Sequence, residues 1–325
     1  MEGRSGFRFW EEYGEIQEYR ETGITGPDRM RVIDANARAL GLSDQVLMEG
    51  AGQALASVVR RFTPKSVLIL CGPGKNGGDG MVTARILAGE ADVTVCWYEG
   101  RHVAPATLLQ VRNLQCCAVK IRRFRTRDEI LALSSLFSEA DLIVDALLGT
   151  GSSGDLREPL ATGVSLAAAS GRPIVSADIP TPGITPAVIC AFHQAKTEGA
   201  EVFSIGIPVQ AEICTGPGDL LLVPDRSLNA HKGDGGSLLV IGGGPYQGAP
   251  YLAGMAALRA GADIVRVASP VSLPAPDLIH EPMSGERIGE EDTERLARLC
   301  SGADVVVCGP GLGDKSHQVI TAVSP

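Results

Sequence analysis

The stretch 66-SVLILCGPGKNGGDG-80 decides how this sequence is expected to fold. Its first part, 66–72, is a continuous run of apolar and β-branched residues, which is typical of a strand buried on both faces. Five glycines and Asp79 follow, and a helical pattern begins there. Strand, glycine-rich turn and helix in this order predict one unit of a parallel α/β sheet. Since a bare strand-to-helix turn needs only one or two glycines, the loop is expected to have a further purpose.

The same order of strand, turn and helix recurs along the first two thirds of the chain. Further strands are expected at 92–98, 118–124, 141–149 and 172–180. Helices are expected at 27–41, 45–62 and 79–90, the first with Pro27 near its start and Gly41 at its end. The pattern predicts a Rossmann-like, doubly wound parallel sheet.

A second unit of the same kind begins later in the chain. The pattern resets with a strand at 237–243, followed by a helical stretch and by strands at 263–270 and 304–313. We therefore expect three parts, namely an acidic N-terminal extension at 1–24, a first domain at 25–226 and the beginning of a second α/β domain at 227–325. About 100 residues is short for a doubly wound domain, so this second domain is expected to be incomplete.

Composition and charge exclude several classes of function. A net charge of −9 over 325 residues argues against a large nucleic-acid surface. The eight cysteines show no CxxC pair or zinc spacing, as is typical of reduced thiols in a cytosolic protein. No run approaches the roughly 20 apolar residues that span a bilayer. We expect a cytoplasmic protein with neither nucleic acid nor membrane as a partner.

Three aspartates follow predicted strands, at positions 79, 145 and 178. Carboxyl ends of parallel strands meet at one edge of a sheet, so all three are expected to converge on one cleft. With Asn76 and Thr181 they offer the hard oxygen ligands of a weakly held cation. Helix capping by Asp145 remains an alternative, as does a tight turn with close helix packing for the glycines. The glycine spacing does not match GxxxxGK[ST].

Six segments carry a family resemblance. "LMEGAG" (47–52), "GPGKNGGDGMVTARIL" (72–87), "DLIVDALLGTG" (141–151) and "SADIP" (176–180) resemble the epimerase domain of the bifunctional NAD(P)H-hydrate repair enzymes. "HKGDGGSLLVIGGGPYQGAPYLAGMAALRAGADIVRVASP" (231–270) and "ADVVVCGPGLG" (303–313) resemble the start of their ribokinase-like, ADP- or ATP-dependent dehydratase domain. The resemblance implies an epimerase acting on the R and S hydrates of NADH or NADPH at C6, upstream of dehydration of the S form.

The resemblance also implies roles for individual residues. Asp178 matches the carboxylate that touches the hydrated ring and is the expected catalytic residue. Asn76, Asp145 and Thr181 match potassium ligands. The expected substrate-binding residues are Lys75, Asn76, Gly77, Gly78, Asp79, Gly149, Thr150, Gly151, Ser152, Ser153, Gly154, Asp155 and Asp178. Expected cofactors are potassium and, for a complete dehydratase domain, ADP or ATP with magnesium.

The sequence departs from the family pattern at several positions. Gly50 stands where the family has Asn, Lys75 replaces the first Asn of "NNGGDG", and Pro182 is added after Thr181. Lys75 either contacts a phosphate or weakens a neighbouring cation. The family's catalytic aspartate of the dehydratase lies in a "GTGD" motif beyond Pro325, so we expect no dehydratase activity from this chain alone unless a separate chain completes the domain. A homo-oligomer is also expected.

Two other classes of function stay open. A nicotinamide-dependent oxidoreductase would share the sheet, but it should carry a ribose-binding acidic residue at the end of the second predicted strand, where Cys96 and Trp97 stand. A non-catalytic nucleotide-binding or interaction module would keep the fold and lose the chemistry, with residues 1–23 as its contact surface. Potassium-dependent epimerisation separates these alternatives from a repair enzyme.

Overall fold

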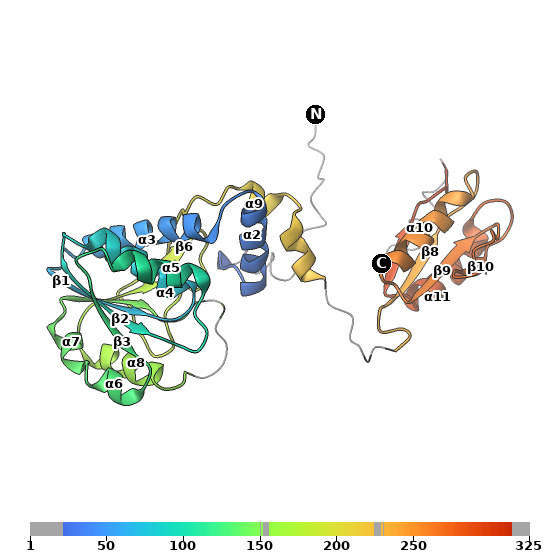
Figure 1. The fold of residues 1–325 in the computed structure, drawn as a ribbon. Helices are drawn as coiled ribbons and strands as arrows, with labels where there is room; N and C mark the ends of the chain where they lie inside the picture. The colour runs from blue at the N-terminus through green and yellow to red at the C-terminus, as the bar shows by residue number, and fades with distance from the viewer. Residues whose placement is uncertain (1–21, 150, 152–155, 224–228, 230, 314–325) are drawn as a thin grey trace. The chain divides into compact units, whose positions relative to one another are not determined.

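The computed structural model describes residues 22–149, 151, 156–223, 229 and 231–313. The chain divides into two compact units, Met1–Val223 and Pro224–Pro325. Figure 1 shows both, and each unit is described by itself below.

A seven-stranded parallel sheet forms the centre of the first unit, in the order β3-β2-β1-β4-β5-β6-β7. Its strands are β1 Ser66–Cys71, β2 Asp92–Tyr98, β3 Lys120–Phe124, β4 Leu142–Ala146, β5 Ile174–Ala177, β6 Val188–Phe192 and β7 Glu201–Phe203. The predicted doubly wound parallel sheet is confirmed. From β1 the chain runs outward to β3 on one side, then crosses to β4 on the other side of β1 and continues outward to β7. Ligands of such sheets bind at the switch point, which here lies between β1 and β4.

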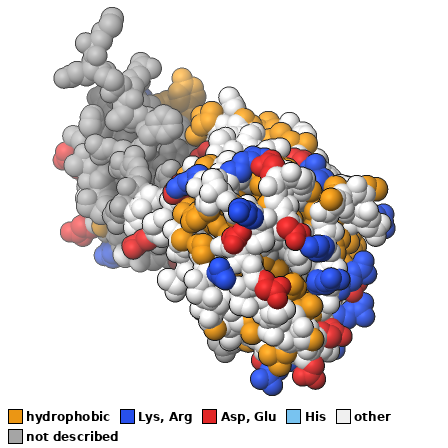
Figure 2. Space-filling model, turned by 90° about the vertical axis from the view of Figure 1, so that its left-hand side faces the viewer, with side chains coloured by type: hydrophobic (Ala, Val, Ile, Leu, Met, Phe, Trp, Pro, Cys, Tyr) orange, Lys and Arg blue, Asp and Glu red, His pale blue; other side chains and the backbone are white. Residues whose placement is uncertain are grey.

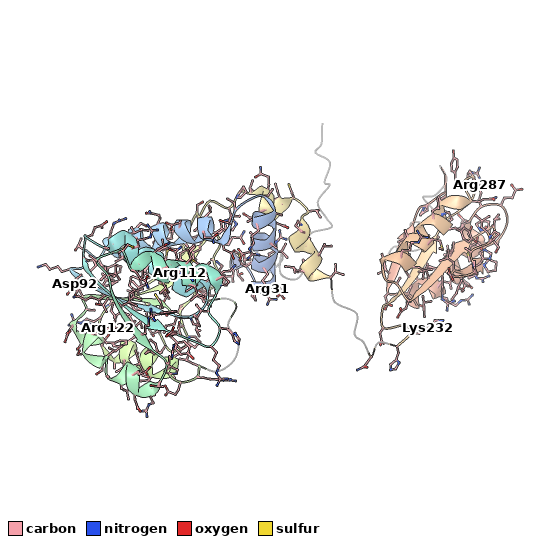
Figure 3. All side chains as sticks on the ribbon, in the orientation of Figure 1. Arg31, Asp92, Arg112, Arg122, Lys232 and Arg287 are labelled. Atoms are coloured by element: carbon pink, nitrogen blue, oxygen red, sulfur yellow. The ribbon has the colours of Figure 1, made fainter. Side chains whose placement is uncertain are left out.

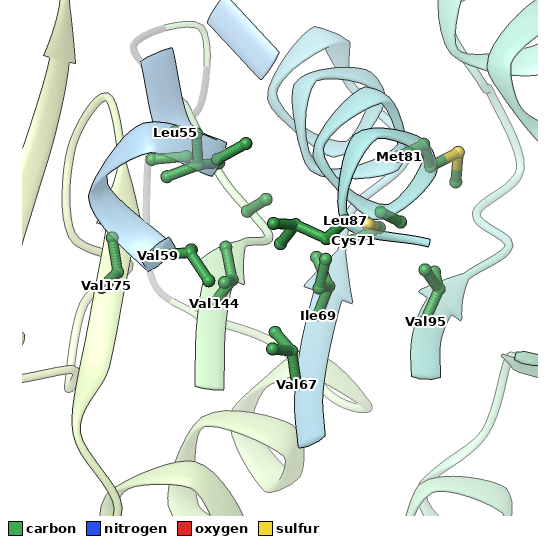
Figure 4. Close-up of a cluster of buried hydrophobic side chains, with 14 of the residues drawn as sticks. Leu55, Val59, Val67, Ile69, Cys71, Met81, Leu87, Val95, Val144 and Val175 are labelled. Atoms are coloured by element: carbon green, nitrogen blue, oxygen red, sulfur yellow. The ribbon is translucent and has the colours of Figure 1, made fainter. Parts of the chain in front are cut away.

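Helices cover both faces of the sheet (Figure 1). They are α2 Pro27–Ala39, α3 Asp44–Arg60, α4 Lys75–Leu87, α5 Pro105–Leu114, α6 Arg127–Leu131, α7 Ser134–Glu139 and α8 Leu160–Ala169, followed by α9 Gln210–Ile213 and the 3-10 helix η2 Pro217–Leu222. Alternate residues of β1 enter two separate cores. Ile69 packs toward α3 and α4 (Figure 4), and Leu68 packs toward α6 and α8. Burial on both faces explains why this strand is continuously apolar.

Local sequence signals fix the start of the helices near the site. Pro27 occupies the first turn of α2, where its missing N–H is not needed. The side chain of Ser43 caps α3 by accepting a hydrogen bond from the Val46 backbone N–H at 3.4 Å. Helix α4 has Gly74 at its N-cap and no side-chain cap, so its first N–H groups are not satisfied by a capping side chain.

The glycine-rich segment differs from the expectation in two ways. Helix α4 begins at Lys75, so Asn76, Gly77, Gly78 and Asp79 lie in its first turns rather than in a loop. None of the five glycines from 72 to 80 has a positive φ. Gly72, Gly77, Gly78 and Gly80 have close neighbours: a Cβ at Gly77, for example, would lie 2.0 Å from the Gly72 carbonyl oxygen. Close helix packing, the alternative left open above, accounts for these four glycines, whereas a Cβ at Gly74 would meet no atom within 4 Å.

Strands β6 and β7 were missing from the sequence-based expectation. They are short, and no long helix separates them from β5. After β7 the chain returns to α2, where Asn36 donates to the Ala211 carbonyl oxygen and accepts from the Gly218 N–H. This return places the end of the first unit beside its beginning (Figure 1).

The second unit contains a four-stranded parallel sheet in the order β10-β9-β8-β11. Its elements are β8 Ser237–Ile241, α10 Gly248–Ala260, β9 Ile264–Ser269, β10 Ile279–Pro282, η3 Glu290–Asp292, α11 Thr293–Ser301 and β11 Val305–Cys308. Two apolar clusters lie beside the sheet, one around Leu239 and Leu296 and one around Val240 and Tyr251. Strand β10 and helix α11 were not expected from sequence.

The surface carries charges of both signs. Figure 2 shows Lys and Arg side chains interspersed with Asp and Glu on one face of the molecule. Exposed pairs such as Arg60 with Glu90 and Lys120 with Asp92 contribute little to stability, because water and salt screen the two charges. Within the described ranges, no helix has the length and apolar character needed to cross a membrane.

Candidate active site

A cavity of about 820 Å³ opens in the first unit beside the switch point between β1 and β4. Residues after β1 (Pro73–Asn76), after β4 (Leu147–Gly149) and after β5 (Asp178) line it, together with α2 and α3. Its charged and polar lining residues are Arg31, Asp34, Arg38, Asp44, Lys75, Asn76, Asp79, His102, Asp178 and Lys196. We call it the β1/β4 cavity. Asp92, at the start of β2, lies at the opposite end of this unit from Arg31 (Figure 3).

Asp178 forms an ion pair in this cavity with Lys196. The Lys196 Nζ lies 2.5 Å from the Asp178 Oδ1 and also donates to the Phe192 carbonyl oxygen at 2.7 Å. Side-chain exposure is 6% for Lys196 and 13% for Asp178, so the pair is held largely away from bulk water. Asp178 has φ 63°, a conformation that Asp and Asn adopt more readily than most residues. In this backbone conformation Asp178 is one of the residues that line the cavity.

Asp79 is the second buried carboxyl group of the cavity. It is 8% exposed, and none of the described residues donates a hydrogen bond to its side chain. Burial raises the pKa of Asp79 well above its usual range, and the negative charge of Asp178 raises it further. Lys75 and Lys196 oppose this shift. Asp79 therefore tends to hold its proton where an exposed aspartate would not.

Charged side chains from three elements meet at another part of the cavity lining. The Oδ1 of Asp44 accepts from Lys75 Nζ at 3.0 Å and from Arg38 Nε at 2.9 Å. Burial raises the pKa of Asp44, but the hydrogen bonds from Arg38 and Lys75 outweigh this and hold it below its usual range. Asp34 lies nearby, and burial raises its pKa. Arg38 also pairs with Asp34 at 4.0 Å, so two cations and two carboxylates form one charged network in the cavity lining.

Asp145 and Thr181 form a buried cluster under the edge of the sheet. The Asp145 carboxylate accepts from the Thr181 Oγ1 at 2.7 Å, the Thr181 N–H at 2.9 Å, the Ser176 Oγ at 2.9 Å and the Leu147 N–H at 3.3 Å. Burial raises the pKa of Asp145, while these four donors lower it. Asp145 is fully buried and does not line the cavity. The expectation that Asp79, Asp145 and Asp178 share one cleft is wrong for Asp145, because β5 and its following turn cover it.

Asn76 connects this cluster to the cavity. Its Nδ2 donates to the Leu148 carbonyl oxygen at 2.6 Å and to the Ala177 carbonyl oxygen at 3.1 Å, bridging the ends of β4 and β5. Its Oδ1 is buried and accepts no hydrogen bond from any of the described residues. A buried amide oxygen without a donor costs free energy unless a ligand satisfies it, so this atom is a candidate cation ligand.

The other predicted binding residues are placed as follows. Lys75, Asn76, Asp79, Gly149, Gly151 and Asp178 line the cavity. Gly77 and Gly78 lie in α4 against the Gly72 backbone and Met48, and do not line it. Thr150, Ser152, Ser153, Gly154 and Asp155 lie outside the described residues.

Sequence reasoning missed Lys196. It follows β6 in "FHQAK", a strand that was not expected, so no strand end drew attention to it. The segment is held by buried contacts: His193 lies 3.0 Å from Glu212, and the Gln194 side chain donates to the same carboxylate at 2.5 Å. His193 thus has a structural setting, and burial lowers its pKa.

Gly50, one of the departures from the family pattern, has a packing explanation. A Cβ at this position would lie 2.7 Å from the Ile205 carbonyl oxygen. In this chain glycine lets α3 approach the segment after β7.

Fold and site together define the class of protein. A doubly wound parallel sheet with a cavity at its switch point, lined by buried carboxyl groups and cations, is a small-molecule site of the kind that binds nucleotides. Matches to two family models identify the class of protein more specifically. Residues 44–209 match the model of the YjeF-related protein N-terminus, and residues 238–324 match that of the NAD(P)H-hydrate dehydratase.

Curated relatives agree along the whole chain. A bifunctional NAD(P)H-hydrate repair enzyme Nnr from Methanospirillum hungatei is 54% identical over 325 residues, covering 100% of this chain and 67% of the relative. Those from Pyrobaculum aerophilum and Archaeoglobus fulgidus are 40% and 38% identical, covering 87% and 88% of this chain and 63% and 65% of their own lengths. The chain belongs to the family of bifunctional NAD(P)H-hydrate repair enzymes, and it spans about two thirds of the length of these relatives.

A solved structure supports the fold of the first unit. The crystal structure of the yeast protein ynu0 has a TM-score of 0.50 and 24% sequence identity, covering 56% of this chain and 86% of the yeast chain. At this identity the likeness concerns the fold alone.

Proposed function

We propose that the first unit interconverts the R and S forms of NADH or NADPH hydrate at C6, as an epimerase. Family membership supports the substrate class, and the Asp178–Lys196 ion pair in the β1/β4 cavity is the observation that supports the chemistry. An oxidoreductase would need a way to hold a nicotinamide cofactor beside a second substrate. The segment 72-GPGKNG-77 has the GxGxxG spacing of dinucleotide-binding loops, so glycine spacing does not separate the two classes, and family membership is what favours the repair enzyme.

The chemistry of the hydrate explains why a carboxyl group is needed. C6 carries the hydroxyl group and is bonded to the ring nitrogen. When the hydroxyl is protonated, water leaves and the nitrogen lone pair forms a C=N bond, after which water returns to either face. General acid–base catalysis of this kind contributes about 10²- to 10⁴-fold in rate. Asp178 is proposed to touch the hydrated ring and to carry the proton, while Lys196 holds its carboxylate in position.

Asn76, Asp145 and Thr181 are proposed to hold a potassium ion. The fit rests on the buried Asn76 Oδ1, which has no hydrogen-bond partner among the described residues. Thr181 Oγ1 donates to Asp145 and keeps its own lone pairs for a cation. A bound potassium ion would supply positive charge next to the substrate's diphosphate. Since no group of three or more His, Cys, Asp and Glu side chains in the described parts of the chain is arranged as a metal site, a weakly held cation with amide and hydroxyl ligands is the better match.

The first turn of α4 is proposed to hold the diphosphate of the hydrate. Its free N–H groups and the positive end of the helix dipole favour an anion. Lys75 Nζ can add a direct contact, because its partner Asp44 is also neutralised by Arg38. Gly149 and Gly151 face the same space, and segment 149–155 is the proposed contact for the ribose.

The second unit is proposed to be part of the ADP- or ATP-dependent dehydratase, with magnesium and the nucleotide as its cofactors. Its match to the dehydratase model supports this. A homo-oligomer, a separate partner chain and a cytoplasmic location stay predictions. Incubating the purified chain with S-NADHX, magnesium and either ADP or ATP, and following NADH by its absorbance, tests whether this chain dehydrates the S hydrate.

The epimerase proposal is tested by following the exchange of R- and S-NADHX by chromatography, in potassium and then in sodium buffer. Wild type should exceed the spontaneous rate, and Asp178→Asn should lose about 10²- to 10⁴-fold. Asn is the suitable replacement because it tolerates the positive φ of this position, where Ala would add strain. Asp92→Asn, at the opposite edge of the sheet, is the matched control and should keep the full rate. A wild-type rate equal to the blank would reject the proposal and favour a non-catalytic binding module.

A further inference from the structure

Asp79 has no role in the mechanism above beyond binding, yet its surroundings are unusual. It lies in the first turns of α4, almost fully buried, on the wall of the β1/β4 cavity. The neighbouring Gly78 packs closely against Met48 of α3, and Gly80 packs against Ala146 at the end of β4, so α4 is held closely between α3 and the sheet at this point. A buried carboxyl group without a hydrogen-bond donor is costly, and proteins keep such groups mainly where they act.

Two carboxyl groups of the cavity have different settings. Asp178 forms an ion pair with the ammonium group of Lys196. Asp79 has no such partner, and burial together with the charge of Asp178 favours its protonated form. Pairs of acids whose environments separate in this way often divide the work of acid and base between them.

We propose that Asp79 is a second catalytic residue of the epimerase, which carries the proton that Asp178 does not. This inference rests on the proposed epimerase function and extends it. Epimerisation requires a proton donor for the hydroxyl that leaves and a proton acceptor for the water that returns. Asp79 and Asp178 supply the two roles from separate elements, α4 and the turn after β5.

Each half-reaction balances with these two groups. Asp79 gives its proton to the C6 hydroxyl, the C6–O bond breaks with its electron pair leaving on water, and the ring nitrogen lone pair forms the C=N bond. A water molecule then adds to the other face of C6 and gives a proton to the Asp178 carboxylate, and the C=N electron pair returns to nitrogen. The enzyme now holds Asp79 ionised and Asp178 protonated, which is the state that catalyses the reverse direction. Proton exchange through water in the cavity restores the first state.

The charged groups facing Asp79 come from several elements. Asp178 and Asp34 raise its pKa, while Lys75 and Lys196 lower it, and burial outweighs them all. The epimerisation rate should therefore fall at high pH as Asp79 loses its proton. A change at Lys75 should move this fall to higher pH, because a cation that favours the ionised form is removed.

The test compares wild type, Asp79→Asn and Asp79→Ala in the full chain, with Asp92→Asn as the control. We expect Asp79→Asn to lose about 10²- to 10⁴-fold in kcat/KM in both directions and to lose the fall at high pH. Affinity for the hydrate, measured by equilibrium titration, should change less than tenfold. Added formate should restore part of the rate of Asp79→Ala, since a small acid can enter the space that the side chain leaves.

The outcomes are separable. Retention of the wild-type rate within threefold and of the wild-type pH profile in Asp79→Asn would overturn the inference while the epimerase function stands. So would a rate loss that follows a loss of affinity and is not restored by formate, because Asp79 would then only bind. If wild type does not exceed the spontaneous rate, the epimerase function itself fails, and the inference fails with it.

Discussion

Two glycine-rich sheet edges in the same chain use glycine for different reasons. At the β1–α4 edge of the first unit, none of the five glycines from 72 to 80 has a positive φ, and each of Gly72, Gly77, Gly78 and Gly80 is in contact that a Cβ would disrupt. At the β8 and β11 edge of the second unit, Gly243, Gly244, Gly309, Gly311 and Gly313 all have positive φ. The first edge needs small residues for packing alone. The second needs glycine for backbone conformation, and at Gly243 and Gly311 it needs the space as well.

The close packing of the first edge determines which side chains of α4 reach the cavity. Because α4 is pressed against the sheet, Asn76 and Asp79 in its first turns reach the cavity next to Asp178. At the other edge, left-handed glycines bend the backbone after the strands, as in loops that present N–H groups to a ligand. Similar glycine counts in sequence therefore do not indicate similar sites.

The largest stability effect should follow from adding a methyl group at the packed edge. Gly77→Ala would place its Cβ 2.0 Å from the Gly72 carbonyl oxygen, and backbone on both sides cannot easily move. We expect a loss of about 3 kcal/mol in the opening free energy of the first unit, measured by amide hydrogen exchange of the full chain. Gly248→Ala, in α10 with open space around its Cβ, is the control and should cost nothing. Equal effects at the two positions would contradict the packing explanation.

A smaller effect is expected at the second edge. Gly309 has φ 133° and no atom within 4 Å of its Cβ position, so Gly309→Ala meets conformational strain alone. The expected cost is about 1–2 kcal/mol, confined to the second unit and read from the same exchange experiment. A neutral result would mean that the positive φ is not required there, and would remove the contrast between the two edges.

The smallest effect at neutral pH concerns the buried charge of the first edge. The pKa of Asp79 is raised in the folded state. The stability of the fold therefore falls as the pH rises from the usual pKa of aspartate toward the higher pKa of folded Asp79. Asp79→Asn should remove this fall and raise the melting temperature at pH 8, by a few degrees at most.

Asp141 is the opposite case, because backbone N–H groups of Ser66 and Lys65 lower its pKa. Asp141 therefore stabilises the fold at pH values above the usual pKa of aspartate, and this contribution is lost as the pH falls through the lower pKa of folded Asp141. Asp141→Asn should lower the melting temperature at pH 7. Differential scanning fluorimetry at several pH values measures both; equal pH slopes for the two variants would contradict this assignment.

The sequence by itself determined the parallel sheet, the strands β1 to β5 and the family. Continuous apolar runs are a strong signal because burial on both faces leaves no room for alternation. It also identified Asn76, Asp79 and Asp178, since residues just after parallel strands meet at one edge. Short strands such as β6 and β7 carry little pattern, and Lys196 was missed with them.

Only the tertiary structure decided which of these carboxyl groups are fully buried, which are paired and which line the cavity. It buried Asp145 under the turn after β5 and paired Asp178 with Lys196, whereas Asp79 receives no hydrogen bond from the residues that the structure describes. It also showed that the glycines after β1 serve packing rather than a left-handed turn. The physical reason is that strand order and spacing are local properties of a sequence, whereas burial and pairing of charges depend on contacts between residues far apart in it. Asp178 and Lys196 are a clear case, because β6 lies between them in the chain while their charged groups meet in the cavity.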